Sequence, residues 1–190
     1  MGNIEAWERP FGASTTSIWT VGHSTRSFEA FLTLLTEQRI ASLVDVRHYP
    51  GSRRVTWATK ENLAIALSER GIAYEHIVDL GGYRKPVGGT MNQGWHNAGF
   101  RGYADHMGSP EFVMALDRLV EMAKGTRTAI MCAEAVPWKC HRSLLSDSLL
   151  VRGVPVVHII KLGQTQEHHL TPFARVHGNR VTYPAPQKGA

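Results

Sequence analysis

Both cysteines of the chain lie in one stretch, residues 131–150 (MCAEAVPWKCHRSLLSDSLL), together with an acid, an imidazole and a guanidinium. These five residues are Cys132, Glu134, Cys140, His141 and Arg142. A thiolate is a strong nucleophile and metal ligand, and a neighbouring cation or a helix N-terminus lowers the pKa of a thiol. Histidine and glutamate exchange protons in acid–base catalysis. The stretch therefore contains the residue types of a reactive site.

The sequence leaves four interpretations of these cysteines open. Either one could be a nucleophilic or redox-active thiol, although the phosphatase spacing Cys-x5-Arg is absent. A zinc site made of Cys132, Glu134, Cys140 and His141 is disfavoured by the wide cysteine spacing and the lack of a second pair, and we predict no metal site. The start of a helix beside Arg142 could hold a phosphate or a carboxylate. Both cysteines could also be small buried apolar residues.

Polar side chains also follow two other apolar stretches, at the point where each predicted strand ends. The first stretch is SIWTVGHS, and the second, ASLVDVRHYPGSRR, stops at a Pro-Gly turn. The polar residues at these two ends are His23, Ser24, Asp45, Arg47, Ser52 and Arg53. Each of these residues, taken alone, can be explained by an ordinary structural role, such as a loop hydrogen bond or a structural Asp–Arg ion pair.

The elements that would position these residues alternate between strands and helices. Helical spacing of apolar residues and capping residues predict helices within residues 26–40, 59–71, 109–125 and 139–153. Short β-branched runs predict strands at the two stretches above and within residues 72–82, 127–134 and 154–160. We therefore expect an α/β fold, a mostly parallel sheet of about five strands with helices on both faces, as in a Rossmann-like three-layer sandwich. Ligands bind at the carboxyl ends of such strands, so the polar residues should converge there.

Residues 81–108 interrupt this alternation with a glycine-rich segment that is predicted to be a long loop. Its rings and cations include Trp95, Arg101 and Tyr103. Such a mixture suits stacking on bases and contacts with phosphates, or a lid over a small substrate. A surface loop whose rings pack on the domain is the alternative.

Composition limits the class of protein. The chain has 190 residues, 43% of them hydrophobic, a formal charge of +5 and a pI of about 9.5. We expect an N-terminal arm over residues 1–16, one domain over 17–162 and a polar tail over 163–190. No signal peptide or membrane span is expected. Two cysteines do not suggest a disulfide framework, so we expect a cytoplasmic protein. The charge permits a nucleic-acid partner without requiring one.

The motifs together resemble the domain-of-unknown-function 488 family. They are TVGHST, DVRHYPGSRR, LGG, FRGYADHM and MCAEAVPWKCHR followed by VRGVPVVHI, which span about Thr20 to Ile160. The resemblance implies a small α/β domain with these motifs as its site. The residues carried over are His23, Ser24, Asp45, Arg47, Pro50, Ser52, Arg101, Tyr103, Asp105, Cys132, Glu134, Cys140, His141 and Arg142.

The favoured hypothesis is an enzyme acting on an anionic substrate, with a nucleotide or nucleic acid as the best candidate. Glu134 or Asp45 would be the acid–base group, and His23 or His141 would orient or shuttle a proton. The candidates for substrate binding are Ser24, Arg47, Ser52, Arg53, Arg101, Tyr103, Cys140 and Arg142. Cys132 would be a nucleophile, a ligand or a wall of the site. The alternatives are a non-catalytic nucleic-acid-binding module and a metal- or redox-responsive Cys/His protein. The sequence identifies no cofactor and no oligomeric state.

Overall fold

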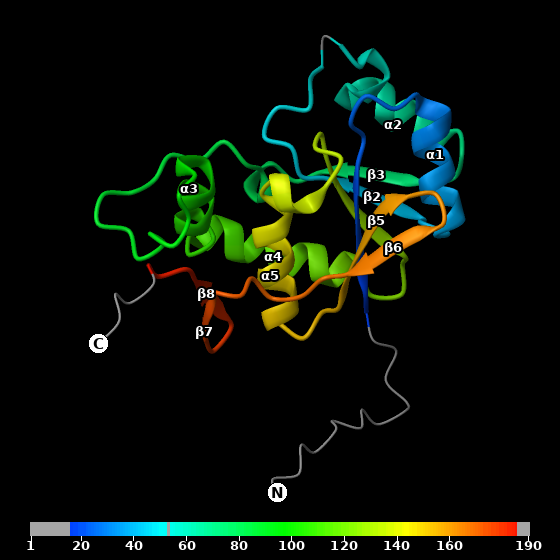
Figure 1. Cartoon of the computed structure of the whole chain (residues 1–190). Coiled ribbons are helices and arrows are strands. Elements are labelled where there is room, and N and C mark those ends of the chain that lie inside the picture. Colours follow the sequence, from blue (N-terminus) through cyan, green and yellow to red (C-terminus); the bar gives the residue numbers. More distant parts are fainter. Residues whose placement is uncertain (1–15, 53, 186–190) are drawn as a thin grey trace, which may run out of the picture.

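The computed structural model describes residues 16–52 and 54–185, and Figure 1 shows their arrangement. Arg53, which the sequence nominates for substrate binding, lies outside the described residues. The strands are β1 (Ile18–Gly22), β2 (Ser42–Asp45), β3 (Ala73–His76), β4 (Thr128–Cys132), β5 (Val156–Lys161), β6 (Gln164–Glu167), β7 (Arg175–His177) and β8 (Arg180–Thr182). The α-helices are α1 (Phe28–Glu37), α2 (Lys60–Ser68), α3 (Ala98–His106), α4 (Pro110–Met122) and α5 (Arg142–Val151). Short 3₁₀ turns occupy Thr56–Ala58, Val78–Leu80 and Pro137–Lys139.

The first six strands form one sheet in the order β3-β2-β4-β1-β5-β6. The pairs from β3 through β5 are parallel, and β6 joins the edge in antiparallel orientation. Strands β7 and β8 form a separate hairpin. The predicted mostly parallel α/β sheet is therefore confirmed, with one strand more than expected.

Helices cover both faces of the sheet, which makes the three-layer sandwich (Figure 1). One core lies between the sheet and α3, α4 and α5, and the other lies between the sheet and α1 and α2. Alternate residues of one strand enter opposite cores, as Leu43 and Val44 do on β2. This double burial explains why the central strands read as continuous apolar runs.

All four predicted helices form, and three of them begin where the capping residues indicate, whereas α5 begins at Arg142 without a side-chain cap. Side chains of Ser27, Thr59 and Ser109 accept backbone N–H groups at the starts of α1, α2 and α4. Among the described residues, no helix is both long and apolar enough to cross a membrane.

Two segments differ from the expectation. The predicted loop at 81–108 contains α3, which begins at the N-cap Asn97 and buries Gly102 and Tyr103. Glycine is a poor helix former, so the sequence conceals this helix until its packing is known. The segment after Lys161 contributes β6, β7 and β8, and it includes Tyr183, which is fully buried. Its polar composition reflects edge and hairpin strands whose outer faces are exposed.

Gly22, the last residue of β1, permits a close backbone crossing at the end of the sheet. A Cβ atom built at Gly22 would lie 1.7 Å from the carbonyl oxygen of Glu134, which belongs to the segment that follows β4. The backbone of His23 donates a hydrogen bond to the carbonyl of Cys132 (3.1 Å) in the same region. The β1 and β4 ends are therefore held together by a contact that only glycine allows.

We predict that Gly22→Ala lowers the free energy of unfolding by about 1–3 kcal/mol or more, because a methyl group cannot fit against a main-chain carbonyl. Gly51→Ala is the matched control, since a Cβ there meets nothing within 4 Å, and it should change stability by less than about 0.5 kcal/mol. Chemical denaturation of both variants measures this difference. Equal stability of the two variants would contradict the proposed crossing.

Candidate functional site

The carboxyl ends of β1 and β4 form the point where the chain leaves the sheet in opposite directions. The two strands are neighbours, with Gly22 opposite Cys132. After β1 the chain enters α1 on one face, whereas after β4 it enters α5 on the other. Such a divergence opens a crevice between adjacent strands, which is where open α/β sheets bind ligands.

A cleft of about 370 Å³ lies at this point, and we call it the thiol cleft. It contains residues from the ends of β1, β2 and β4, from the segment before α5 and from the start of α3. Its lining comprises His23, Arg47, His48, Tyr49, Gly51, Ser52, Gly82, Tyr83, Asn97, Gly99, Phe100, Tyr103, Cys132, Ala133, Glu134, Lys139, Cys140 and His141. The convergence expected from the sequence therefore occurs for the three strand ends that carry His23, Arg47 and Cys132.

The two thiols contact each other in the lining of the cleft. The sulfur atoms of Cys132 and Cys140 are 3.1 Å apart, and both residues are free cysteines that are largely buried. The backbone N–H of Glu134 points at the sulfur of Cys132 (3.3 Å). The backbone N–H of Arg142, at the start of α5, points at the sulfur of Cys140 (3.4 Å). Each sulfur thus has a main-chain donor that would stabilise a thiolate.

Arg142 lies behind the thiols and has no access to solvent. Its Nε donates to the sulfur of Cys132 (3.0 Å), its Nη2 to the carbonyl of Glu134 (2.5 Å) and its Nη1 to the hydroxyl of Thr20 (3.1 Å). No carboxylate of a described residue forms an ion pair with Arg142. A buried charge requires a counter-charge, and the only anionic partner that this environment offers in direct contact is a thiolate.

The thiol pair is therefore set up to lose one proton easily. The hydrogen bond from the Cys132 thiol lowers the pKa of Cys140 to about 6, against the effect of burial and with the help of the Arg142 charge. Burial raises the pKa of Cys132 well above the ordinary value. A pair that shares one proton and carries one negative charge would satisfy both the guanidinium of Arg142 and the main-chain N–H groups at the two sulfurs.

His23 and Arg47 form a second polar group in the lining. Arg47 binds the buried carboxylate of Asp45 through Nε and through Nη2 (2.5 Å), and Tyr74 donates to the same carboxylate (2.9 Å). The Nη1 of Arg47 lies 3.3 Å from Nε2 of His23, whose Nδ1 lies 2.8 Å from the carbonyl of Ser24. An arginine only donates and a carbonyl only accepts, so His23 is protonated on Nδ1. Burial lowers the pKa of His23, which favours this neutral form.

His141 presents its other ring nitrogen to the cleft. Its Nε2 donates to the carbonyl of Val46 (2.8 Å), which leaves Nδ1 as an acceptor beside Gly82. Burial lowers the pKa of His141 to about 4, so the ring is neutral at pH 7. The ring of Tyr103 lies 5.0 Å from the imidazole, and its hydroxyl donates to the carbonyl of Leu80. Tyr103 therefore forms a wall of the cleft, with its hydroxyl already engaged.

Other nominated residues have different positions. Asp45 does not line the cleft and instead orients Arg47. Arg101 donates to the carbonyls of Trp95 and His96 and is also absent from the lining. Ser24 lies next to the cleft in a left-handed backbone conformation (φ 52°), and its N–H donates to Ala133. Ser52 lines the cleft, where its hydroxyl accepts the N–H of Val55.

The cleft residues that sequence reasoning did not nominate as site residues include Tyr49, Tyr83 and Lys139. Tyr49 and Tyr83 have side chains that are 68% and 84% exposed, and their ring centroids are 5.9 Å apart. Tyr83 has a positive φ of 60°, an uncommon conformation for a non-glycine residue. Lys139 lines the cleft directly before Cys140. The dipeptide Lys-Cys was visible in the sequence, whereas the pairing of two tyrosines from distant segments was not.

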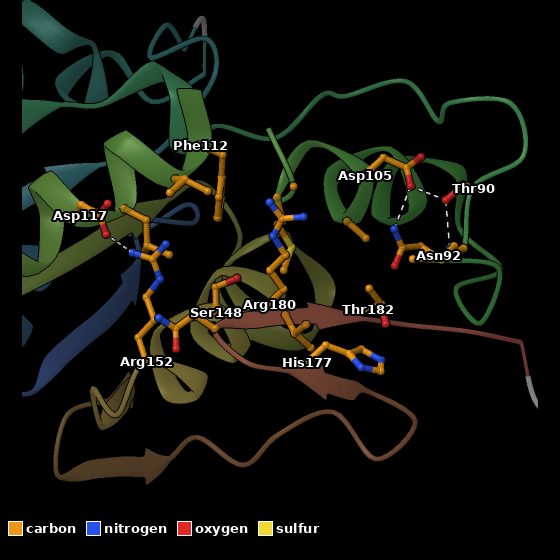
Figure 2. Close-up of a pocket in the computed structure, with 18 of the residues that line it drawn as sticks. Thr90, Asn92, Asp105, Phe112, Asp117, Ser148, Arg152, His177, Arg180 and Thr182 are labelled. Carbon is orange, nitrogen blue, oxygen red and sulfur yellow. Dashed lines mark hydrogen bonds and ion pairs between the residues drawn. The ribbon is translucent and has the colours of Figure 1, made fainter. Parts of the chain in front are cut away.

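A larger cavity of about 1070 Å³ lies elsewhere, between α4, the β7–β8 hairpin and the segment 87–92 (Figure 2). Figure 2 shows Arg180 extending from β8 into this space. Two of its other cations are paired, Arg152 with Asp117 and Lys124 with Glu121. The carboxylate of Asp105 accepts hydrogen bonds from the side chains of Thr90 and Asn92 and from the backbone N–H of Val87. This cavity has no thiol in its lining, so the thiol cleft is the better candidate for chemistry.

Within the part of the chain that the structure describes, no three His, Cys, Asp or Glu side chains are grouped so that they could hold a metal ion. At the thiol cleft, the sulfur atoms face each other and Arg142, and His141 binds a carbonyl through Nε2.

We predict that one thiol of the native protein reacts with iodoacetamide with a pH midpoint near about 6, so that reactivity falls as the pH drops below this value. Cys132→Ala should raise the midpoint because it removes the hydrogen bond to Cys140, whereas Cys132→Ser keeps a hydroxyl donor and should raise it less. Mass spectrometry of the alkylated protein across pH measures all three. A native midpoint near the ordinary cysteine value of about 8.5 would contradict the assignment.

Comparison with known proteins identifies the family of the chain and indicates no substrate or activity. The sequence model described as "Domain of unknown function DUF488" matches residues 27–149, which is more than half of the chain and includes Cys132, Cys140 and Arg142. Neither a search of curated proteins nor a search of solved structures found a significant match. The resemblance noted from the motifs is therefore confirmed, and the chain belongs to the domain of unknown function 488 family.

Proposed function

We propose that the protein is an enzyme whose nucleophile is the Cys140 thiolate and whose substrate is anionic. The single observation that carries the proposal is the contact of two thiols in the lining of a cleft with a buried guanidinium that has no carboxylate partner among the described residues. A thiolate formed this way is reactive at neutral pH, which is the requirement for nucleophilic catalysis by cysteine. The proposal fits a reducing compartment, and we place the protein in the cytoplasm.

An anionic substrate is favoured by the cations of the cleft. Arg47 and Lys139 line it, and Glu134 is the one carboxylate among its lining residues. The N-terminus of α5, next to Cys140, adds the positive end of a helix dipole. A phosphate or carboxylate bound here would lie beside the nucleophile.

A nucleotide or nucleic acid is our best candidate because of the rings at the cleft. Tyr49 and Tyr83 expose their rings, and Phe100 and Tyr103 line the wall. Exposed aromatic rings stack on bases, and this arrangement would place a planar ring at the tyrosines and a charged group near Lys139. The basic pI of about 9.5 is consistent with such a partner.

The acid–base group of the proposal is Glu134. Its side chain is exposed and lines the cleft, so it can reach a substrate, whereas Asp45 is fully buried on Arg47. In the proposed step, the Cys140 sulfur forms a bond to the electrophilic atom as the bond to the leaving group breaks, and the leaving group departs with the bonding electrons and takes a proton from water. The Glu134 carboxylate then accepts a proton from the water that hydrolyses the bond to sulfur and restores the Cys140 thiolate. His23 and His141 orient the substrate through their neutral rings.

The experiment that tests this function uses a panel of nucleoside phosphates and short oligonucleotides. We expect at least one compound to slow alkylation of Cys140, and we expect the same compound to be converted by the native protein. Tyr83→Ala should weaken this protection by about tenfold, in line with about 1–3 kcal/mol for a lost base stack. Cys140→Ser and Glu134→Gln should fold and lose turnover.

Three outcomes distinguish the functions. Binding that is strongly salt-dependent, together with no conversion, would identify a non-catalytic nucleic-acid-binding module. If non-aromatic anions slow the alkylation of Cys140 equally in the native protein and in Tyr83→Ala, the enzyme hypothesis is retained and a nucleotide substrate is rejected. No protection by any anion would reject the proposed substrate class.

A redox-responsive protein is a second candidate, supported by the 3.1 Å separation of the sulfurs. A disulfide bond is about 2.05 Å long, so a small movement would join them. Oxidation of one thiol and one thiolate to the disulfide would release two electrons and one proton, and hydrogen peroxide would be the oxidant, taking these up to become water and hydroxide. We predict that peroxide removes both thiols at low oxidant excess, without sulfinic acid, and that dithiothreitol restores them. Mass spectrometry under non-reducing conditions checks this, and sulfinic acid at one cysteine alone would reject it.

A further inference from the structure

A chain of hydrogen bonds links the thiol site to a buried carboxylate that the proposed chemistry does not use. Arg142 donates through Nη1 to the hydroxyl of Thr20 (3.1 Å), and that hydroxyl lies 2.8 Å from Nδ1 of His158. Nε2 of His158 lies 3.0 Å from Nδ1 of His168, and Nε2 of His168 lies 2.8 Å from Oδ1 of Asp147. We call these five residues the buried relay.

The fold brings these residues to one side of the sheet. Thr20 on β1 and His158 on β5 are register partners, so their side chains leave the sheet on the same face. Arg142 and Asp147 belong to α5, which packs on that face. His168 directly follows β6 and its backbone N–H donates to Val156. The edge strand β6 is therefore needed to complete the relay.

With both imidazoles neutral, the chemistry of the two ends fixes the direction of every hydrogen bond between them. An arginine can only donate, and a carboxylate can only accept. Thr20 must therefore accept from Arg142 and donate to Nδ1 of His158. Each histidine must then accept at Nδ1 and donate from Nε2. Among the hydrogen bonds of the described residues, the Thr20 hydroxyl has no acceptor other than His158, which excludes the reverse direction.

The relay is built as a buried structural unit. Thr20, Arg142 and Asp147 are fully buried, and His158 is 4% exposed. Asp147 accepts three further hydrogen bonds, two from Thr171 and one from the hydroxyl of Tyr183. Burial, reinforced by the charges of neighbouring groups, lowers the pKa of His158 to about 3, in agreement with its neutral role. A buried network in which every donor and acceptor has a hydrogen-bond partner is rigid.

The relay constrains the orientation of Arg142. Its guanidinium has Nη1 fixed by Thr20 and Nη2 fixed by the carbonyl of Glu134, so the plane of the group is set at two points. The third donor, Nε, then necessarily points at the sulfur of Cys132 (3.0 Å). Without Thr20, the guanidinium could turn about its remaining contact, and the hydrogen bond to the sulfur would weaken.

We propose that Asp147 is a positioning residue of the thiol site, which acts through His168, His158 and Thr20 to hold Arg142 against the sulfur of Cys132. This inference rests on the proposed function in one respect, that the thiol pair is the reactive group. None of the relay residues other than Arg142 contacts a cysteine. Their role is to maintain the alignment of one cation, and through it the ionisation of the thiol pair.

The test is the pH midpoint of iodoacetamide alkylation, measured without any substrate. Thr20→Val removes the hydroxyl without changing the shape of the side chain, and we expect the midpoint to rise by about one pH unit. Thr20→Ser retains the hydroxyl and should restore the native midpoint. Thr128→Val is the matched control, because Thr128 is equally buried on β4 and its hydroxyl bonds only to Thr126.

Asp147→Asn tests the far end of the relay. This variant removes the charge and makes one terminal atom a donor, so the direction of the chain is no longer fixed. We expect the alkylation midpoint to rise, by less than in Thr20→Val. Nitrogen-15 NMR of the native imidazoles provides an independent check, since both His158 and His168 should carry the proton on Nε2.

The outcomes separate this proposal from the proposed function. An unchanged midpoint in folded Thr20→Val and Asp147→Asn, or a proton on Nδ1 of either histidine, overturns the relay and leaves the thiolate enzyme intact. An equal rise in Thr128→Val would assign the effect to general loss of stability and also overturns it. A low native midpoint that rises in the two relay variants, in a protein that converts no substrate, supports the relay and rejects the enzyme.

Discussion

The burial of Arg142, which has no carboxylate partner within residues 16–52 and 54–185, is the constraint on which the rest of the site depends. A guanidinium that is removed from water must find acceptors for its donors and a negative charge in its neighbourhood. In this protein its acceptors are the sulfur of Cys132, the carbonyl of Glu134 and the hydroxyl of Thr20. The arrangement is satisfied best when the thiol pair carries one negative charge. The chemistry of the cysteines is thus a consequence of the charge behind them.

The fold explains how this arrangement is assembled. Helix α5 supplies both buried charges of the network, Arg142 and Asp147, and the carboxyl ends of β1 and β4 supply the crevice in front of the thiols. Because the chain leaves β1 and β4 toward opposite faces, a crevice opens at the carboxyl ends of these two central strands, and residues from the start of α3 line part of its wall. Gly22 allows the main chain of Glu134 to pass over the end of β1, which brings its carbonyl to Arg142. The contacts that stabilise this end of the sheet are therefore also the contacts on which the proposed catalytic site depends.

Sequence reasoning predicted the part of this arrangement that follows from local patterns. The strand ends carrying His23, Arg47 and Cys132 could be identified because polar residues followed apolar runs, and parallel strands bring such ends together. For Asp45 the sequence left a site role and a structural Asp–Arg ion pair open, and for Arg101 it indicated only a site role, since a charged side chain looks the same in the sequence whether it faces a cleft or binds a neighbour. Helix α3 was hidden by its two glycines, of which Gly102 allows close packing against the main chain of Arg84.

The buried relay was beyond sequence reasoning for a different reason. His158 lies in an apolar strand, and its alternation with Val156 places it in a core, but its partners come from β1, α5 and the segment after β6. Only the register of β1 against β5 brings Thr20 beside it. The one signal in the sequence was a histidine at a strand position that faces the core. Such a position indicates that the imidazole has a buried hydrogen-bond partner, but it does not identify that partner.

The most direct test of the central claim is the ultraviolet absorbance of the thiolate, titrated in the native protein and in Arg142→Met. The account predicts one thiolate in the native protein with a midpoint near about 6. It predicts that Arg142→Met, checked for folding by circular dichroism, shifts this midpoint upward because the stabilising charge is gone. No thiolate at neutral pH in the native protein, or the same midpoint in both proteins, would contradict the claim that the buried guanidinium creates the reactive group.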